Sequence, residues 1–544
     1  MTHHDTSAPS EKTTFLAKHP TWWLVLVVLV LSASVRWRLL DMPLERDEGG
    51  YAYFGQLILD GIPPYIHAYG MRLPGTYASY ALLLAVFGET ERGIHLGLLV
   101  INLATVVLVY LVGRRLIDET VGVVAAAAFA LLSLSHPLQG AFANCEHFVN
   151  LMAVAGMLPL INATDNRRLW PLIAAGLLFG SAFVMKQHGI VFVAFGGCYL
   201  LIDEWRRKPV QWPRLTRNCV IYVLAAATPL LLTCVTLWLC GVFDQFWFWT
   251  VMCASTYSSE LPAKQVLLNL FYAVRHVTQG TELLWLLVAL GATAVVWDNA
   301  VRRRWLFLVL LSLFSLLAIC PGFYFRPHYF QLTLPVAALF VGIAIRTLAN
   351  LSSKNGRNTV GQSVAIGVFF LCFGASVFQQ RLYLFEMTPT DVTRTTYPSS
   401  PFVEAQTVAE YVRSRSEPQD RIAVICNEPE IYFYAQRRAA TGHLYFYPLR
   451  GDHDFAPRLR QQMIDEIENA EAKFVIIFDS TARQNAPPNS LEPLFDWLEQ
   501  YVDENYSLVG VVDMFDDGSV FDWAPDVKWS SQADRWIRIL ERNE

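Results

Sequence analysis

Charged residues are scarce in this 544-residue chain: Asp, Glu, Lys and Arg make up 16% of it, whereas 54% of the residues are hydrophobic. The formal net charge is only −5, which is too small to indicate a nucleic-acid partner. The mean hydropathy is positive, at +0.33. Soluble domains carry about a quarter charged residues, so this composition predicts a polytopic membrane protein.

Several motifs are also missing. The sequence shows no nucleotide-binding glycine loop, no CxxC pair, no zinc-binding pattern and no internal repeat. We therefore expect no nucleotide cofactor. Most of the nine cysteines lie in hydrophobic runs and are interpreted as small apolar residues, although a bond between Cys145 and Cys320 stays open. Transporters usually carry paired repeats, so the missing repeat disfavours a lipid or sugar transporter.

Apolar runs close to the length of a membrane helix alternate with charged clusters. About eleven such runs are predicted as membrane spans, which makes the expected fold a mainly α-helical bundle. They lie near residues 21–39, 93–113, 119–136, 147–163, 169–186, 189–203, 217–240, 283–298, 305–320, 329–349 and 362–380.

Lysines and arginines gather in alternate loops, whereas the opposite loops carry acids such as Asp244 and Glu260. The positive-inside rule then predicts a cytoplasmic tail over residues 1–20 and a membrane module over 21–385. The first span has no small-residue cleavage site after it and is expected to stay uncleaved. With an odd number of spans, the C-terminus lies outside the cytoplasm.

The first outer loop, residues 40–92, contains the adjacent acids Asp47 and Glu48 at the end of the first span. Neighbouring carboxylates point in different directions, so one is free to act as a base while the other holds a backbone amide, a metal or another partner. Acids at a membrane boundary favour a functional site. The alternative is a pair of acids that stabilises a helix N-terminus. Gly49-Gly50 is interpreted as a tight turn after the acids.

A second outer loop brings Glu146 and His147 to the same membrane face. Together with Asp47, this acid predicts a cavity suited to a divalent cation, a protonated substrate or an acceptor hydroxyl. Glu146 and His328 are the candidate metal ligands. A hydrogen-bonded interfacial histidine is the simpler interpretation of His147.

Several cations lie on the predicted outer side, against the positive-inside pattern, and each is a candidate for a lipid phosphate. They are Arg72, Lys186, Arg326 and His328. Tyr329 and Gln331 are candidates for orienting a sugar or diphosphate. Snorkelling to headgroups, simple surface charge and an aromatic belt are the ordinary alternatives.

Two shorter apolar segments, 51–59 and 74–88, are predicted to be interfacial helices along the outer leaflet. From residue 386 to 544 the charge rises and long apolar runs stop. Strands predicted at 421–426, 473–478 and 506–512 alternate with helical patterns, of which 456–470 is one. This alternation indicates a soluble α/β domain outside the cytoplasm.

Five segments resemble motifs of a known family in the same order: RDEGGYAYFGQLILDGIPPY, the stretch beginning LPGTYASYALLLAVFG, FANCEHF, MKQHG and FRPHYFQLTLP. The chain resembles the bacterial relatives of protein O-mannosyltransferases and the lipid A aminoarabinose transferases. These are membrane glycosyltransferases of the GT-C fold. The resemblance covers roughly the first 350 residues, and the C-terminal domain matches only in general architecture.

The resemblance implies an enzyme that takes a sugar from a polyprenyl phosphate and transfers it, with inversion, to a protein, lipid or glycan acceptor outside the cytoplasm. Asp47 would be the first-loop acid, acting as the general base or as a carboxylate that positions the acceptor, with Glu48 supporting it, and Glu146 would be the second-loop acid. The cations would serve the lipid phosphate or a metal ion. The chain has Arg72 and a single proline, Pro74, where the aminoarabinose enzymes typically have a lysine before paired prolines, so the donor sugar stays open. A lipid-linked sugar transporter and a non-catalytic glycan-binding membrane protein are the alternatives.

Overall fold

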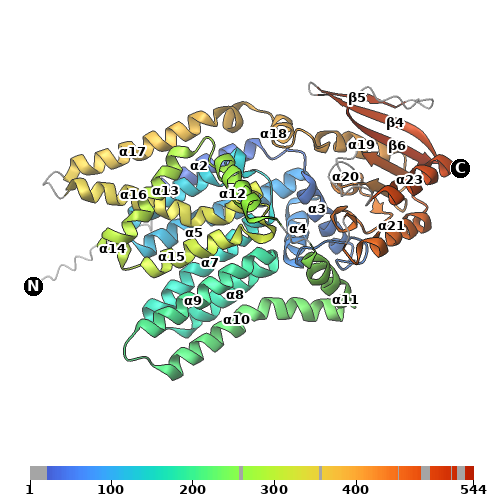
Figure 1. The fold of residues 1–544 in the computed structure, drawn as a ribbon. Helices are drawn as coiled ribbons and strands as arrows, with labels where there is room; N and C mark the ends of the chain where they lie inside the picture. Colours follow the sequence, from blue (N-terminus) through green and yellow to red (C-terminus); the bar gives the residue numbers. More distant parts are fainter. Residues whose placement is uncertain are drawn as a thin grey trace, which may run out of the picture.

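The computed structural model describes residues 21–256, 261–353, 358–450, 453–478, 491–515, 518–523 and 533–543. The predicted tail at 1–20 and the outer acid Glu260 lie outside these residues. The described chain forms a bundle of helices and a smaller domain with a β-sheet, at opposite ends of the molecule (Figure 1). Helices α3 and α4 lie between the two parts.

Every predicted span coincides with a helix, because each long apolar run can bury its backbone polar groups only as a helix in a membrane. These helices are α2 (Thr21–Arg38), α5 (Glu91–Leu116), α6 (Glu119–Leu132), α7 (Cys145–Asn166), α8 (Leu169–Met185), α9 (Ile190–Arg206), α10 (Trp212–Leu239), α13 (Glu282–Trp297), α15 (Trp305–Ala318), α16 (Leu334–Ser353) and α17 (Asn358–Gln379).

Length and apolar composition qualify six helices of the described chain as membrane spans, or up to seven if one bent pair counts as a single span. That pair is α12 (Ala263–Val277) with α13, bent by 114°. Helices α6, α8 and α15 are apolar but have 17 residues or fewer. The protein is therefore an integral membrane protein, but the predicted number of about eleven spans is not established.

The two predicted interfacial helices are α3 (Arg46–Leu59) and α4 (Pro74–Phe87), which pack against each other. Helix α4 exposes Leu82 and Val86, as expected for a helix against lipid. Helix α3 is different, since most of its residues are buried. It also packs on α20 (Glu430–Ala435) of the C-terminal domain. The prediction that α3 lies along the lipid surface is therefore wrong.

Several connections of the bundle are short helical segments. They are η1 (His136–Leu138), η2 (Gln187–Gly189), α11 (Phe243–Trp247), η3 (Phe248–Cys253), η4 (Pro321–Phe323), η5 (Pro327–Thr333) and η6 (Leu382–Glu386). Another short helix, α14 (Asn299–Arg302), lies at the end of the bundle away from α11 (Figure 1). All nine cysteines are free, including Cys145 and Cys320. The disulfide that the sequence left open is thus not formed.

The C-terminal domain is built on a mixed six-stranded sheet in the order β2-β1-β3-β6-β4-β5. Its strands are β1 (Arg421–Ile425), β2 (Arg438–Ala439), β3 (Phe474–Phe478), β4 (Tyr506–Phe515), β5 (Gly518–Asp522) and β6 (Arg535–Arg542). Strand β1 pairs in parallel with β2 and β3, whereas β6 and β5 pair antiparallel with their neighbours.

Among the described residues of this domain, five helical segments accompany the sheet besides α20: α18 (Pro389–Thr396), α19 (Phe402–Ser414), η7 (Tyr447–Leu449), α21 (Ala456–Ala470) and α23 (Glu492–Asn505). Strands β1 and β3 are almost fully buried, which explains why both sequences are continuous apolar runs. The α/β prediction is confirmed for this domain, while α18, α20, β2, β5 and β6 were not predicted.

Candidate active site

A capping box at the start of α3 sets the direction of the first-loop acids. The Glu45 side chain accepts a hydrogen bond from the Glu48 N–H (3.2 Å), and the Glu48 side chain accepts one from the Glu45 N–H (3.1 Å). Residues one position apart on a helix point about 100° away from each other. Asp47 therefore faces a cavity, whereas Glu48 turns into the protein interior.

Glu48 is completely buried and acts as a structural anchor. Its Oε1 accepts a hydrogen bond from the backbone N–H of Ala143 (2.5 Å) and lies 3.1 Å from Nε2 of His95. These contacts connect α3 with the second outer loop and with α5. Glu48 lines neither of the cavities described below, so the structure places it behind Asp47, as a support rather than a reacting group.

Asp47 is the acid that reaches the cavity. The Tyr51 hydroxyl donates a hydrogen bond to its Oδ2 (3.2 Å), and the Arg72 guanidinium lies 3.8 Å from the same oxygen. Burial, together with the Asp47 carboxylate, raises the pKa of the Tyr51 phenol well above its ordinary value. Tyr51 therefore stays protonated and orients Asp47 as a hydrogen-bond donor.

Two adjoining cavities meet at Asp47. One, of about 150 Å³, we call the basic cavity, because Arg46, Arg72 and Arg326 line it. The other, of about 350 Å³, we call the apolar cavity; its wall includes the following residues that the basic cavity lacks: Tyr77, Ile190, Val191, Pro321 and Pro448. Both are lined by Asp47, Arg72, Tyr329 and Tyr447. The Asp47 carboxylate and the Arg72 guanidinium thus lie where the basic cavity joins the apolar cavity.

Arg72, Arg326, His328 and Tyr329, which were predicted from the sequence as contacts of a lipid phosphate or sugar, all line the basic cavity. Nδ1 of His328 lies 2.9 Å from Oε1 of Gln139, which fixes the imidazole ring. Arg326 stacks over Tyr324, with its guanidinium carbon 5.6 Å from the ring centroid. His328 comes from η5 and Arg326 from the loop before it, whereas Arg72 comes from the first loop.

Lys186 and Glu146 form a buried ion pair that lines neither cavity. The Lys186 ammonium also lies 4.3 Å from the ring centroid of Tyr329, so it supports that ring from behind. Oε2 of Glu146 is buried without a hydrogen-bond partner. This pair therefore lies behind the wall residue Tyr329 and faces neither the basic cavity nor the apolar cavity.

Gln331 is fully buried as well and lies away from both cavities. Its amide donates to the Leu138 carbonyl (3.1 Å), and its own backbone carbonyl accepts from Asn150 (2.8 Å). The predicted contact of Gln331 with a sugar is thus not supported by its position. Its hydrogen bonds instead connect η5 with η1 and α7.

The C-terminal domain supplies chamber residues that sequence reasoning missed. Tyr447 lines both cavities and Tyr445 lines the apolar one. The same domain holds Arg46 in place, through the Asn427 carbonyl (2.7 Å) and the Glu428 carboxylate (3.2 Å). The aromatic residues around Tyr445 are the one sequence signal for a cavity wall, and no neighbouring residue in the sequence indicates contact with the first loop.

The predicted metal ligands do not fit a metal centre. Among the described residues, no group of three His, Cys, Asp or Glu side chains has a geometry that could hold a metal ion. Glu146 is paired with Lys186, and His328 is bonded to Gln139. We therefore derive no step through a metal.

The fold defines a class of protein. The chain matches the crystal structure of ArnT from Cupriavidus metallidurans bound to undecaprenyl phosphate, with a TM-score of 0.58, 14% identity and coverage of 96% of this chain and 98% of that one. It also matches the archaeal oligosaccharyltransferase AglB from Archaeoglobus fulgidus, in complex with an inhibitory peptide and a dolichol-phosphate. There the TM-score is 0.56 at 11% identity, over 96% and 76% of the chains. The predicted GT-C fold is confirmed.

Sequence comparison points the same way. Residues 73–238 match the family model described as dolichyl-phosphate-mannose-protein mannosyltransferase. An undecaprenyl phosphate-alpha-4-amino-4-deoxy-L-arabinose arabinosyl transferase of Pseudomonas aeruginosa (strain UCBPP-PA14) is 29% identical over 260 residues. That alignment covers 43% of this chain and 44% of the relative, less than half of either. The predicted resemblance is thus confirmed for the membrane module.

Proposed function

We propose that this protein is an integral membrane glycosyltransferase that transfers a sugar from a polyprenyl-phosphate donor to an acceptor outside the cytoplasm. The observation that carries the proposal is the position of Asp47 beside Arg72, where the basic cavity meets the apolar one. The fold shared with ArnT supports it. We place the protein in a bacterial inner membrane, with its N-terminus in the cytoplasm and residues 386–544 outside.

The basic cavity suits the phosphate of the donor. Arg46, Arg72 and Arg326 surround a small space, and their guanidinium groups can neutralise the charge that develops on the phosphate as it leaves. The apolar cavity, with Ile190 and Val191 in its wall, suits the first part of the prenyl chain or the sugar face. The donor would then lie with its anomeric carbon near Asp47.

The reaction breaks one bond and forms one. An acceptor hydroxyl or amine attacks the anomeric carbon, the bond from this carbon to the phosphate oxygen breaks, and the polyprenyl phosphate leaves with the bonding pair. Asp47 takes the proton of the acceptor, while Tyr51 keeps the carboxylate oriented. Attack from the face opposite to the phosphate inverts the anomeric centre. Arg72, bound between Asp47 and the phosphate, balances charge on both sides.

The test is turnover of radiolabelled polyprenyl-phosphate sugars by the purified full-length protein in detergent, with and without a chelator. We expect Asp47→Asn to reduce donor consumption by about 100-fold or more. Asp244→Asn, at an exposed acid in α11, is the matched control and should keep wild-type turnover. If Asp47→Asn turns over donor normally, Asp47 is not the base. Movement of donor across vesicles without consumption would favour the transporter alternative.

A further inference from the structure

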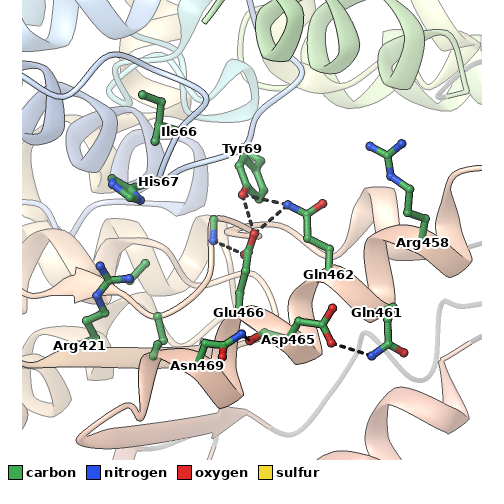
Figure 2. A pocket seen from close by; sticks show the side chains of 14 residues that line it. Ile66, His67, Tyr69, Arg421, Arg458, Gln461, Gln462, Asp465, Glu466 and Asn469 are labelled. Carbon is green, nitrogen blue, oxygen red and sulfur yellow. Dashed lines mark hydrogen bonds between the residues drawn. The ribbon is translucent and has the colours of Figure 1, made fainter. Parts of the chain in front are cut away.

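A third cavity, of about 860 Å³, lies between the first outer loop and the C-terminal domain (Figure 2). None of the residues predicted for the active site lines it. Its walls come from residues 66–69 of the loop, from the ends of β1 and β2, and from one face of α21. We call it the polar pocket. Its volume lies in the range of about 300–1,000 Å³ that small-molecule sites occupy.

The Glu466 carboxylate, each oxygen of which accepts two hydrogen bonds, forms the back of the polar pocket. Oε2 of Glu466 accepts hydrogen bonds from the Thr441 hydroxyl (2.7 Å) and the Gly442 N–H (3.0 Å). Oε1 accepts from the Tyr69 hydroxyl (2.6 Å) and the Gln462 amide (2.8 Å). Figure 2 shows Tyr69, Gln462 and Glu466 joined in this way at the centre of the pocket. The network fixes these groups before any ligand arrives, which lowers the entropic cost of binding.

Helix α21 presents a row of further polar groups. Gln461, Asp465 and Asn469 are four residues apart, so they share one helix face, and all three are exposed. Arg421 and Arg458 stand on opposite sides of the pocket in Figure 2, and their charges balance those of Asp465 and Glu466. The pocket is therefore rich in hydrogen-bonding groups but carries no net formal charge.

This combination favours a neutral polyhydroxyl ligand. Planar amide, carboxylate and guanidinium groups each offer paired donors or acceptors, which match the neighbouring hydroxyls of a sugar ring. A nucleic acid or polyanion would need an excess of positive charge. Burial keeps the pKa of the nearby His67 below its ordinary value, so this side chain adds no positive charge near neutral pH.

One side chain separates the polar pocket from the proposed active site. Tyr69 lines both the polar pocket and the apolar cavity. Its ring stacks on Trp249, with centroids 4.8 Å apart, and its backbone N–H donates to the Gly442 carbonyl (2.7 Å). A ligand in the polar pocket is therefore in contact with the wall of the chamber that holds Asp47.

We infer that the polar pocket binds the saccharide part of the glycosyl acceptor. The inference rests on the proposed function, since it takes Asp47 as the place of transfer. It narrows the acceptor to a molecule with a neutral sugar unit. That unit lies on α21, on the other side of Tyr69 from the apolar cavity.

The first test uses a glycan array of immobilised neutral oligosaccharides, probed with the full-length protein in detergent. Gln461→Ala/Asn469→Ala removes two ligand-facing amides. The matched control is Gln500→Ala/Asn505→Ala in α23, since Gln500 and Gln461 each bond an acid four residues on, and Asn505 and Asn469 each bond a carbonyl four residues back. We expect at least 10-fold weaker binding for the pocket variant and none of this loss for the control. No bound glycan, or equal binding by both variants, overturns the inference.

The second test separates this inference from the proposed function. Hydrolysis of the radiolabelled polyprenyl-phosphate donor by water needs the Asp47 chamber but no acceptor. The Gln461→Ala/Asn469→Ala protein should therefore hydrolyse donor at the wild-type rate. If the wild type consumes no donor while glycans bind at the polar pocket, the proposed function fails, and with it the acceptor assignment. A pocket variant that loses donor hydrolysis would also contradict the assignment.

Discussion

Gly49 of α3 lies directly against Glu430, the first residue of α20 in the C-terminal domain. A Cβ atom added at Gly49 would stand 2.5 Å from the Glu430 Cα, which no real packing allows. At Gly50, an added Cβ would stand 2.9 Å from the ring of Tyr445. Both glycines are inside a regular helix, so the predicted tight turn is wrong. Gly49 is needed because two backbones meet there, and Gly50 because the Tyr445 side chain fills the space beside it.

Gly49→Ala should therefore weaken the contact between the two parts of the protein. We expect a lower melting temperature, corresponding to about 1–3 kcal/mol for an overpacked site, and reduced donor turnover because Tyr445 and Tyr447 move with the domain. The control is Gly367→Ala in α17, where nothing lies within 4 Å of the added Cβ. An unchanged melting curve for Gly49→Ala would contradict the close contact.

Glu48→Gln should differ from Asp47→Asn despite the adjacent positions. The buried Glu48 carboxylate accepts three hydrogen bonds, and an amide in its place cannot accept all of them. We expect a loss of about 1–3 kcal/mol in stability, seen as a lower melting temperature. Asp47→Asn should melt like the wild type and lose turnover instead. The reverse pattern would exchange the two roles.

The Glu146 and Lys186 pair should show strong coupling in a double-mutant cycle. Lys186→Met leaves the Glu146 carboxylate buried without a cation, so we expect about 3–5 kcal/mol of destabilisation. Glu146→Gln/Lys186→Met leaves no unpaired charge and should recover part of this loss. The measurement is thermal unfolding of the four proteins in the same detergent, and additive effects would show that the two side chains do not interact.

His443 gives the protein a dependence on acid pH. Burial lowers the pKa of its imidazole to about 4, and neither ring nitrogen has a hydrogen-bond partner. The unfolded chain has the ordinary histidine pKa near 6.5, so the unfolded state binds more protons between these values. The contribution to stability is complete above about pH 6.5 and falls as the pH decreases toward 4.

The melting temperature of His443→Phe should therefore fall less between pH 7.5 and pH 4.5 than that of the wild type. Phenylalanine can keep the edge-to-face contacts that His443 makes with Tyr69 and Trp249. The control is His276→Phe, at an exposed position of α12, which should keep the wild-type pH dependence. If the melting temperatures of the wild type and His443→Phe fall in parallel with pH, the His443 imidazole is not the source of the acid-pH dependence.

The sequence predicted most helices because apolar runs and charged ends are local signals. The segment 456–470 coincides with α21, and the strands at 421–426 and 473–478 differ from β1 and β3 by one residue. The site was predicted less completely. Arg72, Arg326 and His328 do gather around Asp47, but Lys186 and Gln331 lie behind the wall.

What the sequence could not show depends on contacts between distant segments. The role of Gly49 follows only from the position of Glu430, some 380 positions later, and that of Arg46 from Asn427 and Glu428. No periodicity in the first loop indicates such a partner. The predicted number of about eleven spans is not confirmed, because several of the apolar helices are short.

The first loop and the C-terminal domain line the same two cavities, which has a consequence for protein engineering. Residue 386 marks a change in composition, and it would be a natural junction for exchanging the C-terminal domain between relatives. Yet Arg46 is held by Asn427 and Glu428, and Tyr447 lines both the basic cavity and the apolar cavity. A chimera joined at that point would replace Tyr447 and both partners of Arg46 while keeping the first loop that they contact. We therefore expect the two cavities to stay intact only if the first loop is exchanged together with the domain.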